Sequence, residues 1–141
     1  MPARLRGKPT WLISQVETVA HRLLTERLAA AGARGYHYRL LAALAEFGPS
    51  SQAALGRRTA MDRSDVVAVV NELAGQGLVE RDTDQADRRR NIISITPNGA
   101  RRLRELDVLL AAVQDELLAP LSGQQRSQLI ELLSRILGAH G

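Results

Sequence analysis

Arginine supplies most of the charged chemistry of this sequence. Nineteen of the 141 residues are Lys or Arg against fifteen Asp or Glu, so the formal net charge is +4, and nearly all of the positive charge is arginine. Arg57 and Arg58 are adjacent, and Arg88, Arg89 and Arg90 form a run. A guanidinium can donate two parallel hydrogen bonds to a phosphate or to the edge of a base. These groups favour an anionic partner, although a genome with biased codon usage would give the same enrichment.

No group of residues has the spacing of a catalytic or metal site. The sequence contains no Ser–His–Asp pattern, no paired carboxylates and no phosphate-binding glycine loop. His21, His37 and His140 fall on three separate predicted elements without ligand-like spacing, and cysteine is absent. We therefore expect no enzyme activity, no metal, no cofactor and no disulfide.

The N-terminal residues 1–9, MPARLRGKP, are basic and contain Gly and Pro, which predicts a flexible arm. This segment has no apolar core of signal-peptide length, and no apolar stretch reaches the ~20 residues of a bilayer-spanning helix. We expect a soluble cytoplasmic protein without membrane contact. Residues 10–141 are expected to form one domain, in which helices within 10–35 and 97–141 flank a central part at 36–96.

The central part contains two predicted helices joined by a tight turn, between Ser51 and Gly77. Ser51 is a good N-cap for a short helix over 52–58, and Asp62 and Asp65 suit the start of a second helix. Four apolar residues of the second helix recur at helical spacing and predict its buried face. They are Val66, Val69, Val70 and Leu73. The opposite face carries Arg63, Ser64, Val67, Ala68 and Asn71. This helix-turn-helix arrangement is typical of proteins that place a helix in the DNA major groove.

After Gly77 the pattern changes to short runs rich in β-branched residues. Residues 78–81 and 92–96 predict two strands, and the loop between them is polar and strongly charged. Together they predict a β-hairpin, or wing, directly after the second helix. Asp87 is expected to hold an arginine of this wing or of its base by a salt bridge. The predicted fold is mainly α-helical with a small β-hairpin, a winged helix-turn-helix with long terminal helices.

Long helices are predicted at both ends of the chain. Residues 10–31 and 97–118 carry apolar stripes, and in the latter the apolar residues alternate three and four apart, as in a coiled coil. Ser122 is expected to start a last helix that ends near Leu137. These helices have more apolar surface than the winged part can cover, which predicts a two-fold homodimer. Two recognition helices would then face successive major grooves, ~34–36 Å apart, on an inverted repeat.

Two segments of the sequence resemble the MarR family of transcriptional regulators. Asp84–Arg90 (DQADRRR) followed by Ile93–Gly99 (ISITPNG) is similar to the wing signature of that family, and Leu73–Arg81 (LAGQGLVER) is similar to the segment before it. The order of predicted elements agrees over about the whole chain. The resemblance implies a dimer held by the terminal helices, base recognition by the second helix and wing arginines in the flanking minor groove. It also implies a pocket for a small phenolic or other aromatic molecule, whose binding weakens DNA binding.

The candidate DNA-binding residues come from the helix-turn-helix and the wing. They are Arg57, Arg58, Arg63, Ser64, Asp65, Val67, Asn71, Arg88, Arg89 and Arg90. Many members of the family carry a polar and then a basic residue where this chain has Val67 and Ala68, so base reading must depend on their neighbours. Asp65 has a competing role as a carboxylate at a helix start. Of the wing arginines, Arg90 is slightly less favoured as the minor-groove residue.

Aromatic residues are scarce in this sequence, and the candidates for a ligand pocket are mostly aromatic. They are Trp11, Tyr36, His37, Tyr38 and Arg39. In the family, the corresponding segments border the pocket, although ordinary core or dimer-interface roles explain the same residues equally well. The function favoured is a repressor that a small molecule releases from DNA. An effector-independent architectural DNA-binding protein and a winged-helix protein-interaction module are the alternatives.

Overall fold

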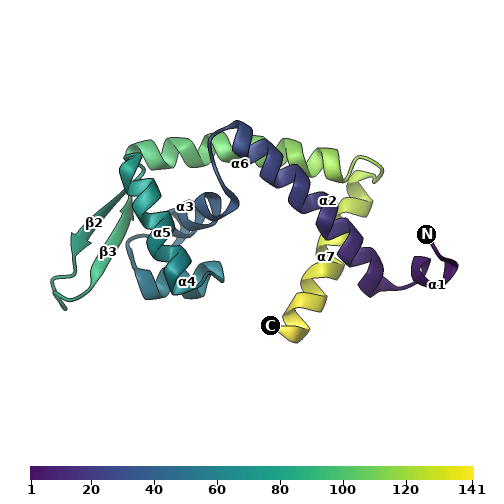
Figure 1. Cartoon of the computed structure of the whole chain (residues 1–141), viewed down its shortest axis with the longest axis horizontal. Coiled ribbons are helices and arrows are strands. Elements are labelled where there is room, and N and C mark those ends of the chain that lie inside the picture. The colour runs from purple at the N-terminus through teal and green to yellow at the C-terminus, as the bar shows by residue number, and fades with distance from the viewer. The chain divides into compact units, whose positions relative to one another are not determined.

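The computed structural model describes all 141 residues, which form seven helices and three short strands (Figure 1). The chain divides into two compact units. The winged lobe is Leu24–Leu110, and the terminal unit combines Met1–Leu23 with Ala111–Gly141. The elements in chain order are α1 (Ala3–Arg6), α2 (Pro9–Ala30), α3 (Gly35–Phe47), β1 (Ser50–Ser51), α4 (Gln52–Thr59), α5 (Arg63–Gly75), β2 (Val79–Thr83), β3 (Asn91–Ile95), α6 (Pro97–Leu117) and α7 (Gly123–His140).

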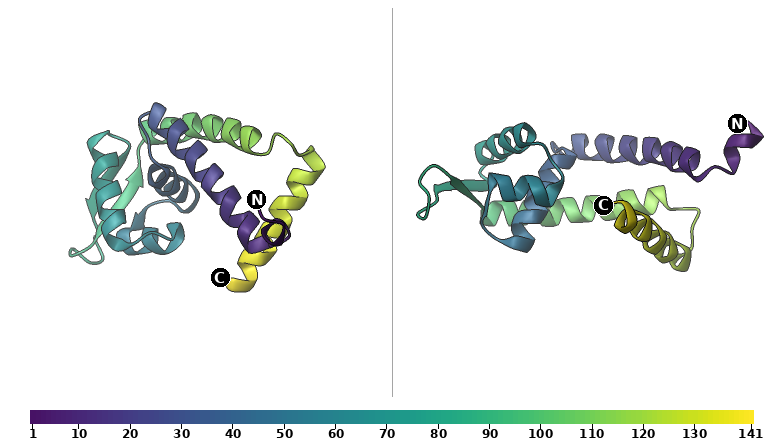
Figure 2. Two further views of the ribbon diagram at one scale, coloured as in Figure 1. Left: turned by 45° about the vertical axis from the view of Figure 1, so that its right-hand side comes forward. Right: turned by 90° about the horizontal axis from the view of Figure 1, so that it is seen from below.

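The winged lobe is built around an aliphatic core between α3, α4 and α5, and its β2–β3 hairpin projects away from these helices in each view (Figures 1 and 2). The buried face predicted for α5 is confirmed, because its four apolar residues are each 0% exposed. They pack with core residues from α3, α4, β3 and α6, namely Leu40, Leu41, Leu44, Leu55, Ile93 and Leu106. Burial of this face fixes which side of α5 remains in solvent.

The two helices of the helix-turn-helix begin differently. The Ser51 hydroxyl accepts a hydrogen bond from the Ala54 N–H at 3.1 Å, so the predicted cap of α4 is confirmed. Asp62 occupies the cap position of α5, but its side chain makes no capping hydrogen bond, contrary to expectation. Ala60 ends α4 with a left-handed backbone conformation, at a φ of 55°. The tight turn is thus made without a glycine at that position.

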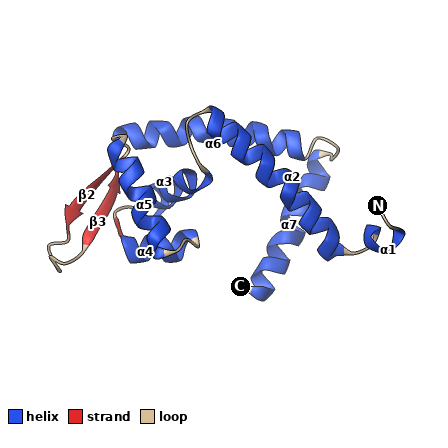
Figure 3. Cartoon of the chain, viewed as in Figure 1, coloured by secondary structure: helices blue, strands red, loops and turns tan.

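The wing belongs to a three-stranded antiparallel sheet with the order β1-β3-β2 (Figure 3). Val79 pairs with Ile95 and Thr83 with Asn91, so both strands lie within a residue or two of their predicted positions. The strand β1 was not predicted. It pairs Ser50 with Ile93 and therefore ties the start of α4 to the wing.

Thr96 joins the wing to α6. Its hydroxyl donates to the Gly77 carbonyl at 2.7 Å and accepts from the Gly99 N–H at 3.0 Å, while its own N–H donates to the Leu78 carbonyl. A Cβ at Gly99 would lie 2.0 Å from the Leu78 carbonyl oxygen, far inside van der Waals contact. Only glycine fits here, so the ends of α5 and β3 and the start of α6 meet at one closely packed point.

The predicted apolar seam of α6 does not need a partner chain. Leu106 is 1% exposed and Val113 is 2% exposed within this chain, so that part of the expectation is wrong. Unpartnered apolar side chains lie instead on α2 and α7. They are Leu12, Ile13, Val16, Val19, Ile130, Leu132, Leu133, Ile136 and Leu137. Nothing on α7 is buried, although its predicted cap is confirmed, because the Ser122 hydroxyl accepts from the Gln125 N–H at 3.2 Å.

Within the predicted flexible arm, Ala3–Arg6 forms a single helical turn. None of the helices combines the length and the hydropathy that a bilayer-spanning segment requires.

Candidate nucleic-acid interface

The solvent face of α5 carries the residues predicted to read bases. Arg63, Ser64, Val67 and Asn71 are all exposed, and Asp65 is half-buried in the first turn. The side chains of Arg63 and Ser64 have no hydrogen-bond or ion-pair partner in the structure, so their donors remain available to a ligand. Ala68 lies exposed in the middle of this face, and its side chain is only a methyl group, so another molecule can approach the helix backbone closely there.

Asn71 differs from its neighbours because its side chain is already engaged. The Arg81 guanidinium on β2 donates a hydrogen bond to the Asn71 amide oxygen. Arg81 is exposed and was not predicted as a functional residue. The contact joins a helix residue to a strand residue, so it depends on the wing folding back against α5, which helical periodicity alone does not reveal.

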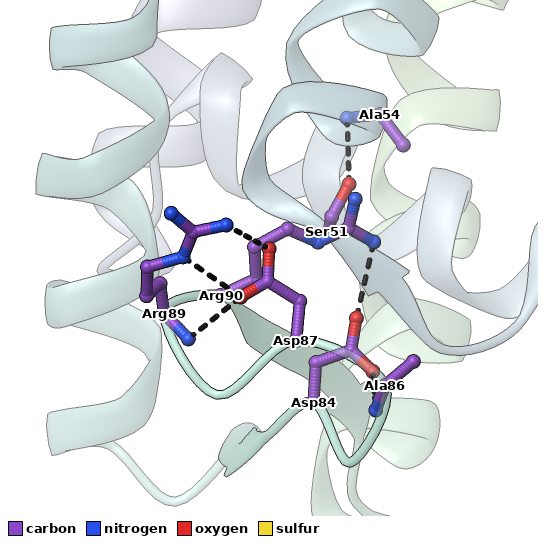
Figure 4. Close-up of polar contacts among 7 residues, drawn as sticks. All are labelled: Ser51, Ala54, Asp84, Ala86, Asp87, Arg89 and Arg90. Carbon is purple, nitrogen blue, oxygen red and sulfur yellow. Dashed lines mark hydrogen bonds and ion pairs between the residues drawn. The ribbon is translucent and has the colours of Figure 1, made fainter.

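The three consecutive arginines of the wing have different surroundings, and Figure 4 shows the contacts of two of them, Arg89 and Arg90. Arg89 donates through Nε to Asp87 Oδ1 at 3.1 Å, and Arg90 pairs with Asp84 Oδ2 at 3.1 Å. Arg88 is exposed and its side chain has no partner in the structure. The salt bridge predicted for Asp87 is therefore confirmed.

The hydrogen bonds from the Arg89 side chain and backbone hold the pKa of Asp87 below its usual range, with a smaller contribution from the charge of Arg90. The carboxylate of Asp87 therefore stays ionised through the neutral pH range. Asp84 also accepts from the Ala86 N–H at 2.9 Å, which shapes the loop between the strands. The wing loop is thus closed by two aspartates, each of which holds one arginine.

A cleft of about 630 Å³ lies between the starts of α4 and α5 and the loop of the wing. Its lining includes four arginines and no carboxylate. The lining residues are Ser51, Gln52, Ala53, Gly56, Arg57, Met61, Arg63, Arg89, Arg90 and Asn91. The guanidinium groups of Arg57 and Arg63 have no carboxylate partner in the structure, so this concave surface has a positive potential suited to a phosphate group.

Arg58 lies away from this cleft, although it was predicted beside Arg57 as a phosphate contact. Its guanidinium stacks on the Phe47 ring, with 4.5 Å to the ring centroid, and donates to the Ser50 hydroxyl at 3.0 Å. Arg58 therefore packs the start of the sheet against the end of α3. The adjacent Arg57 faces the cleft, and one residue along a helix is enough to separate the two directions.

Four of the five candidate ligand residues form contacts within the winged lobe. The His37 Nδ1 atom accepts from the Arg34 N–H at 3.3 Å, so Nε2 carries the proton and donates to Glu72 Oε2 at 2.6 Å. This hydrogen bond is the main reason that the pKa of Glu72 is lowered, and the charge of Arg34 adds to it. His37 is 5% exposed, which indicates that it connects α3 to α5 as a core histidine.

The Tyr38 hydroxyl donates to Asp107 at 2.6 Å, and this hydrogen bond raises the pKa of Tyr38 because the phenolate would lose it. Arg39 stacks on Tyr36 at 5.3 Å and donates to the Thr59 carbonyl at 3.4 Å. The remaining candidate, Trp11, belongs to the terminal unit, and its buried Nε1 atom has no hydrogen-bond partner.

Comparison with known proteins identifies close relatives. Residues 32–90 match the model of the MarR family. The putative transcriptional regulatory protein for the hcr operon of Thauera aromatica is 37% identical over 99 residues, which are 70% of this chain and 60% of that protein. The transcriptional repressor NicR of Pseudomonas putida is 31% identical over 97 residues, or 69% of this chain and 61% of the repressor. The matches thus span about three fifths of these two relatives.

Solved structures extend the likeness to nearly the whole chain. A probable transcriptional regulator from Pseudomonas aeruginosa is 32% identical, with a TM-score of 0.83 and coverage of 94% of this chain and 98% of that one. The PcaV regulator from Streptomyces coelicolor, solved with its natural ligand, is 26% identical, with a TM-score of 0.80 and coverage of 100% and 99%. These relatives are transcriptional regulators and not enzymes. The winged lobe, the family model and the relatives agree, and this chain belongs to the MarR family of transcriptional regulators.

Proposed function

We propose that this protein binds double-stranded DNA as a homodimer and represses transcription until a small molecule releases it. The observation that carries the DNA-binding role is the arginine-lined cleft between the starts of α4 and α5 and the loop of the wing. It adjoins the open face of α5 at Arg63, so one surface combines phosphate attraction with side chains that can reach base edges.

The charge distribution supports separate residues for phosphate attraction and for base recognition. The recognition helix α5 is not basic, because Asp65 and Glu72 outnumber Arg63. Attraction to the phosphate backbone therefore comes from the cleft and from the wing. In this proposal α5 lies in the major groove, where Arg63 pairs with a guanine edge and Val67 contacts a thymine methyl group.

Among the wing arginines, Arg88 is the residue that we assign to the minor groove. Arg89 and Arg90 are held by Asp87 and Asp84, whereas the guanidinium of Arg88 is free. Insertion of Arg88 therefore breaks no internal ion pair. Arg89 and Arg90 remain at the cleft, where their outward N–H groups can donate to a phosphate.

The homodimer is supported by the apolar side chains that α2 and α7 leave in solvent. Val16 is 53% exposed and Leu137 is 72% exposed, and residues of this kind at helical spacing favour a second apolar helix surface as partner. A two-fold dimer presents two winged lobes, so its target is an inverted repeat with half-sites about one helical turn apart.

Release by a small aromatic molecule is the finer part of the proposal. It is supported by two relatives, since NicR is described as a repressor and PcaV has a natural ligand. The mechanism is a population shift, in which the effector binds more tightly to a state of the dimer whose recognition helices do not match the two half-sites. An effector with equal affinity for both states would leave DNA binding unchanged.

The test is selection of bound sequences from a random pool of duplex DNA by the purified protein at physiological salt. Enrichment of one inverted repeat supports a dimeric sequence reader and supplies the probe for an effector screen. Retention of DNA without an enriched motif, together with a steep salt dependence, would favour the architectural alternative. Failure to retain any DNA would favour a protein-interaction module.

A further inference from the structure

The contact between Arg81 and Asn71 restricts what Asn71 can recognise. An arginine side chain carries only hydrogen-bond donors, so the amide oxygen of Asn71 must face it, as the structure has it. The Asn71 amide nitrogen is then directed away from Arg81. Its two N–H groups are the part of the side chain left for a ligand on the exposed face of α5.

The orientation of Asn71 is supported from both sides of the helix. Arg81 lies on β2, where its backbone pairs with Ile93 in the middle of the sheet. The next residue after Asn71, Glu72, accepts from His37 at 2.6 Å and pairs with Arg34 at 3.4 Å. Because Asn71 is bound by β2 and Glu72 is bound by α3, this turn of α5 has little freedom to rotate.

An asparagine that reads adenine must use both ends of its amide. Its oxygen accepts from the adenine N6 amino group while its nitrogen donates to N7. In this protein Arg81 already donates to one lone pair of that oxygen, so an adenine amino group would have to share the acceptor with the guanidinium, with two donors side by side. Guanine presents two acceptors in the major groove, O6 and N7, which suit the N–H groups of Asn71 that are directed away from Arg81.

We infer that Arg81 is a specificity-determining positioning residue, which converts Asn71 into a donor that selects guanine over adenine. The inference rests on the proposed function, because it requires α5 to lie in the major groove. Arg81 acts here through Asn71, and the positive charge beside the amide further favours the electronegative edge of guanine.

The experiment repeats the selection from random duplex DNA with the full chain and four variants. Asn71→Ala identifies the base position that Asn71 reads, because preference is lost there and kept elsewhere. At this position the unaltered protein is expected to select guanine. Arg81→Met removes the donors while keeping a long side chain, so it should shift the preference at this one position toward adenine, by about fivefold or more. Arg81→Lys keeps a donor and should retain guanine.

Arg104→Ala is the matched control, since Arg104 is an exposed arginine of α6 whose side chain has no partner in the structure. Its selected motif should equal that of the unaltered protein. Adenine at the Asn71 position of the unaltered protein, or guanine retained by Arg81→Met, overturns this inference and leaves the proposed function standing. Absence of any enriched motif with the unaltered protein overturns both. Thermal unfolding of each variant verifies that it is folded. If the Met variant is not folded, the base that the unaltered protein selects at the Asn71 position still tests the inference, because adenine there overturns it.

Discussion

Replacement of Arg88 by alanine tests the assignment of the wing most directly. Its guanidinium has no internal partner, so the substitution removes one cation from the DNA-facing surface without leaving an aspartate unpaired, as Arg89→Ala or Arg90→Ala would. Fold stability should stay within about 0.5 kcal/mol of the unaltered protein, as for other exposed substitutions away from structural contacts. Any loss of DNA affinity then reports the lost contact.

The magnitude follows from counterion release. Each neutralised phosphate contributes about 0.9 to the slope of log affinity against log salt concentration, and a dimer loses two such contacts. The slope should therefore become shallower by about 1.8. Between 50 and 200 mM salt, the unaltered protein should lose about 12-fold more affinity than Arg88→Ala, since a fourfold change in salt raised to the power 1.8 is about 12.

Fluorescence anisotropy of a labelled operator at four or five salt concentrations measures this slope. Arg104→Ala serves as the control for a general loss of positive charge and should keep the original slope. Arg63→Ala should behave differently from both, with relaxed preference at one base position. If the slope of Arg88→Ala equals that of the unaltered protein, Arg88 neutralises no phosphate charge from the minor groove, and its assignment there fails.

Three further predictions concern stability and assembly. Gly99→Ala should destabilise the fold by about 3 kcal/mol in urea unfolding, because the new Cβ would meet the Leu78 carbonyl oxygen at 2.0 Å, and a smaller loss would mean that this junction yields easily. The hydrogen bond from His37 lowers the pKa of Glu72 from its ordinary value of 4.5, so Glu72 stabilises the fold above that pH and the contribution is lost as pH falls through the lower folded-state pKa. The stability advantage over Glu72→Gln should therefore shrink below pH 4.5 in unfolding titrations, and an advantage that grows there would contradict the assignment. Val16→Glu should shift sedimentation toward the monomer, and an unchanged dimer would place the interface elsewhere.

Much of the winged lobe could be predicted because its signals are local. The buried face of α5 follows from the spacing of Val66, Val69, Val70 and Leu73, and the wing follows from two short runs of β-branched residues around a charged loop. The cap at Ser51 and the pairing of Asp87 depend on residues two or three positions away. Such features are determined by the nearest neighbours in the chain.

The features that were missed depend on segments distant in sequence. The two-residue strand β1 exists only because Ser50 meets Ile93, and two serines carry no strand preference of their own. The hydrogen bond between His37 and Glu72, which lie 35 residues apart in the chain, connects α3 to α5 and has no local signal in the sequence. The apolar stripe of α6 could be recognised from the spacing of its residues, but this spacing does not reveal which other residues of the chain cover the stripe.

The close packing at Thr96 and Gly99 has a consequence for regulation. The end of the recognition helix, the end of the wing and the start of α6 are packed together at this point without free volume. The recognition helix and the wing are therefore held at a fixed separation and orientation. The interval between the bases read by α5 and the minor groove reached by the wing is then a constant of each protomer. If the proposed function holds, we expect an effector to change the distance between the two winged lobes of the dimer and to leave the fit of each lobe to its own half-site unchanged.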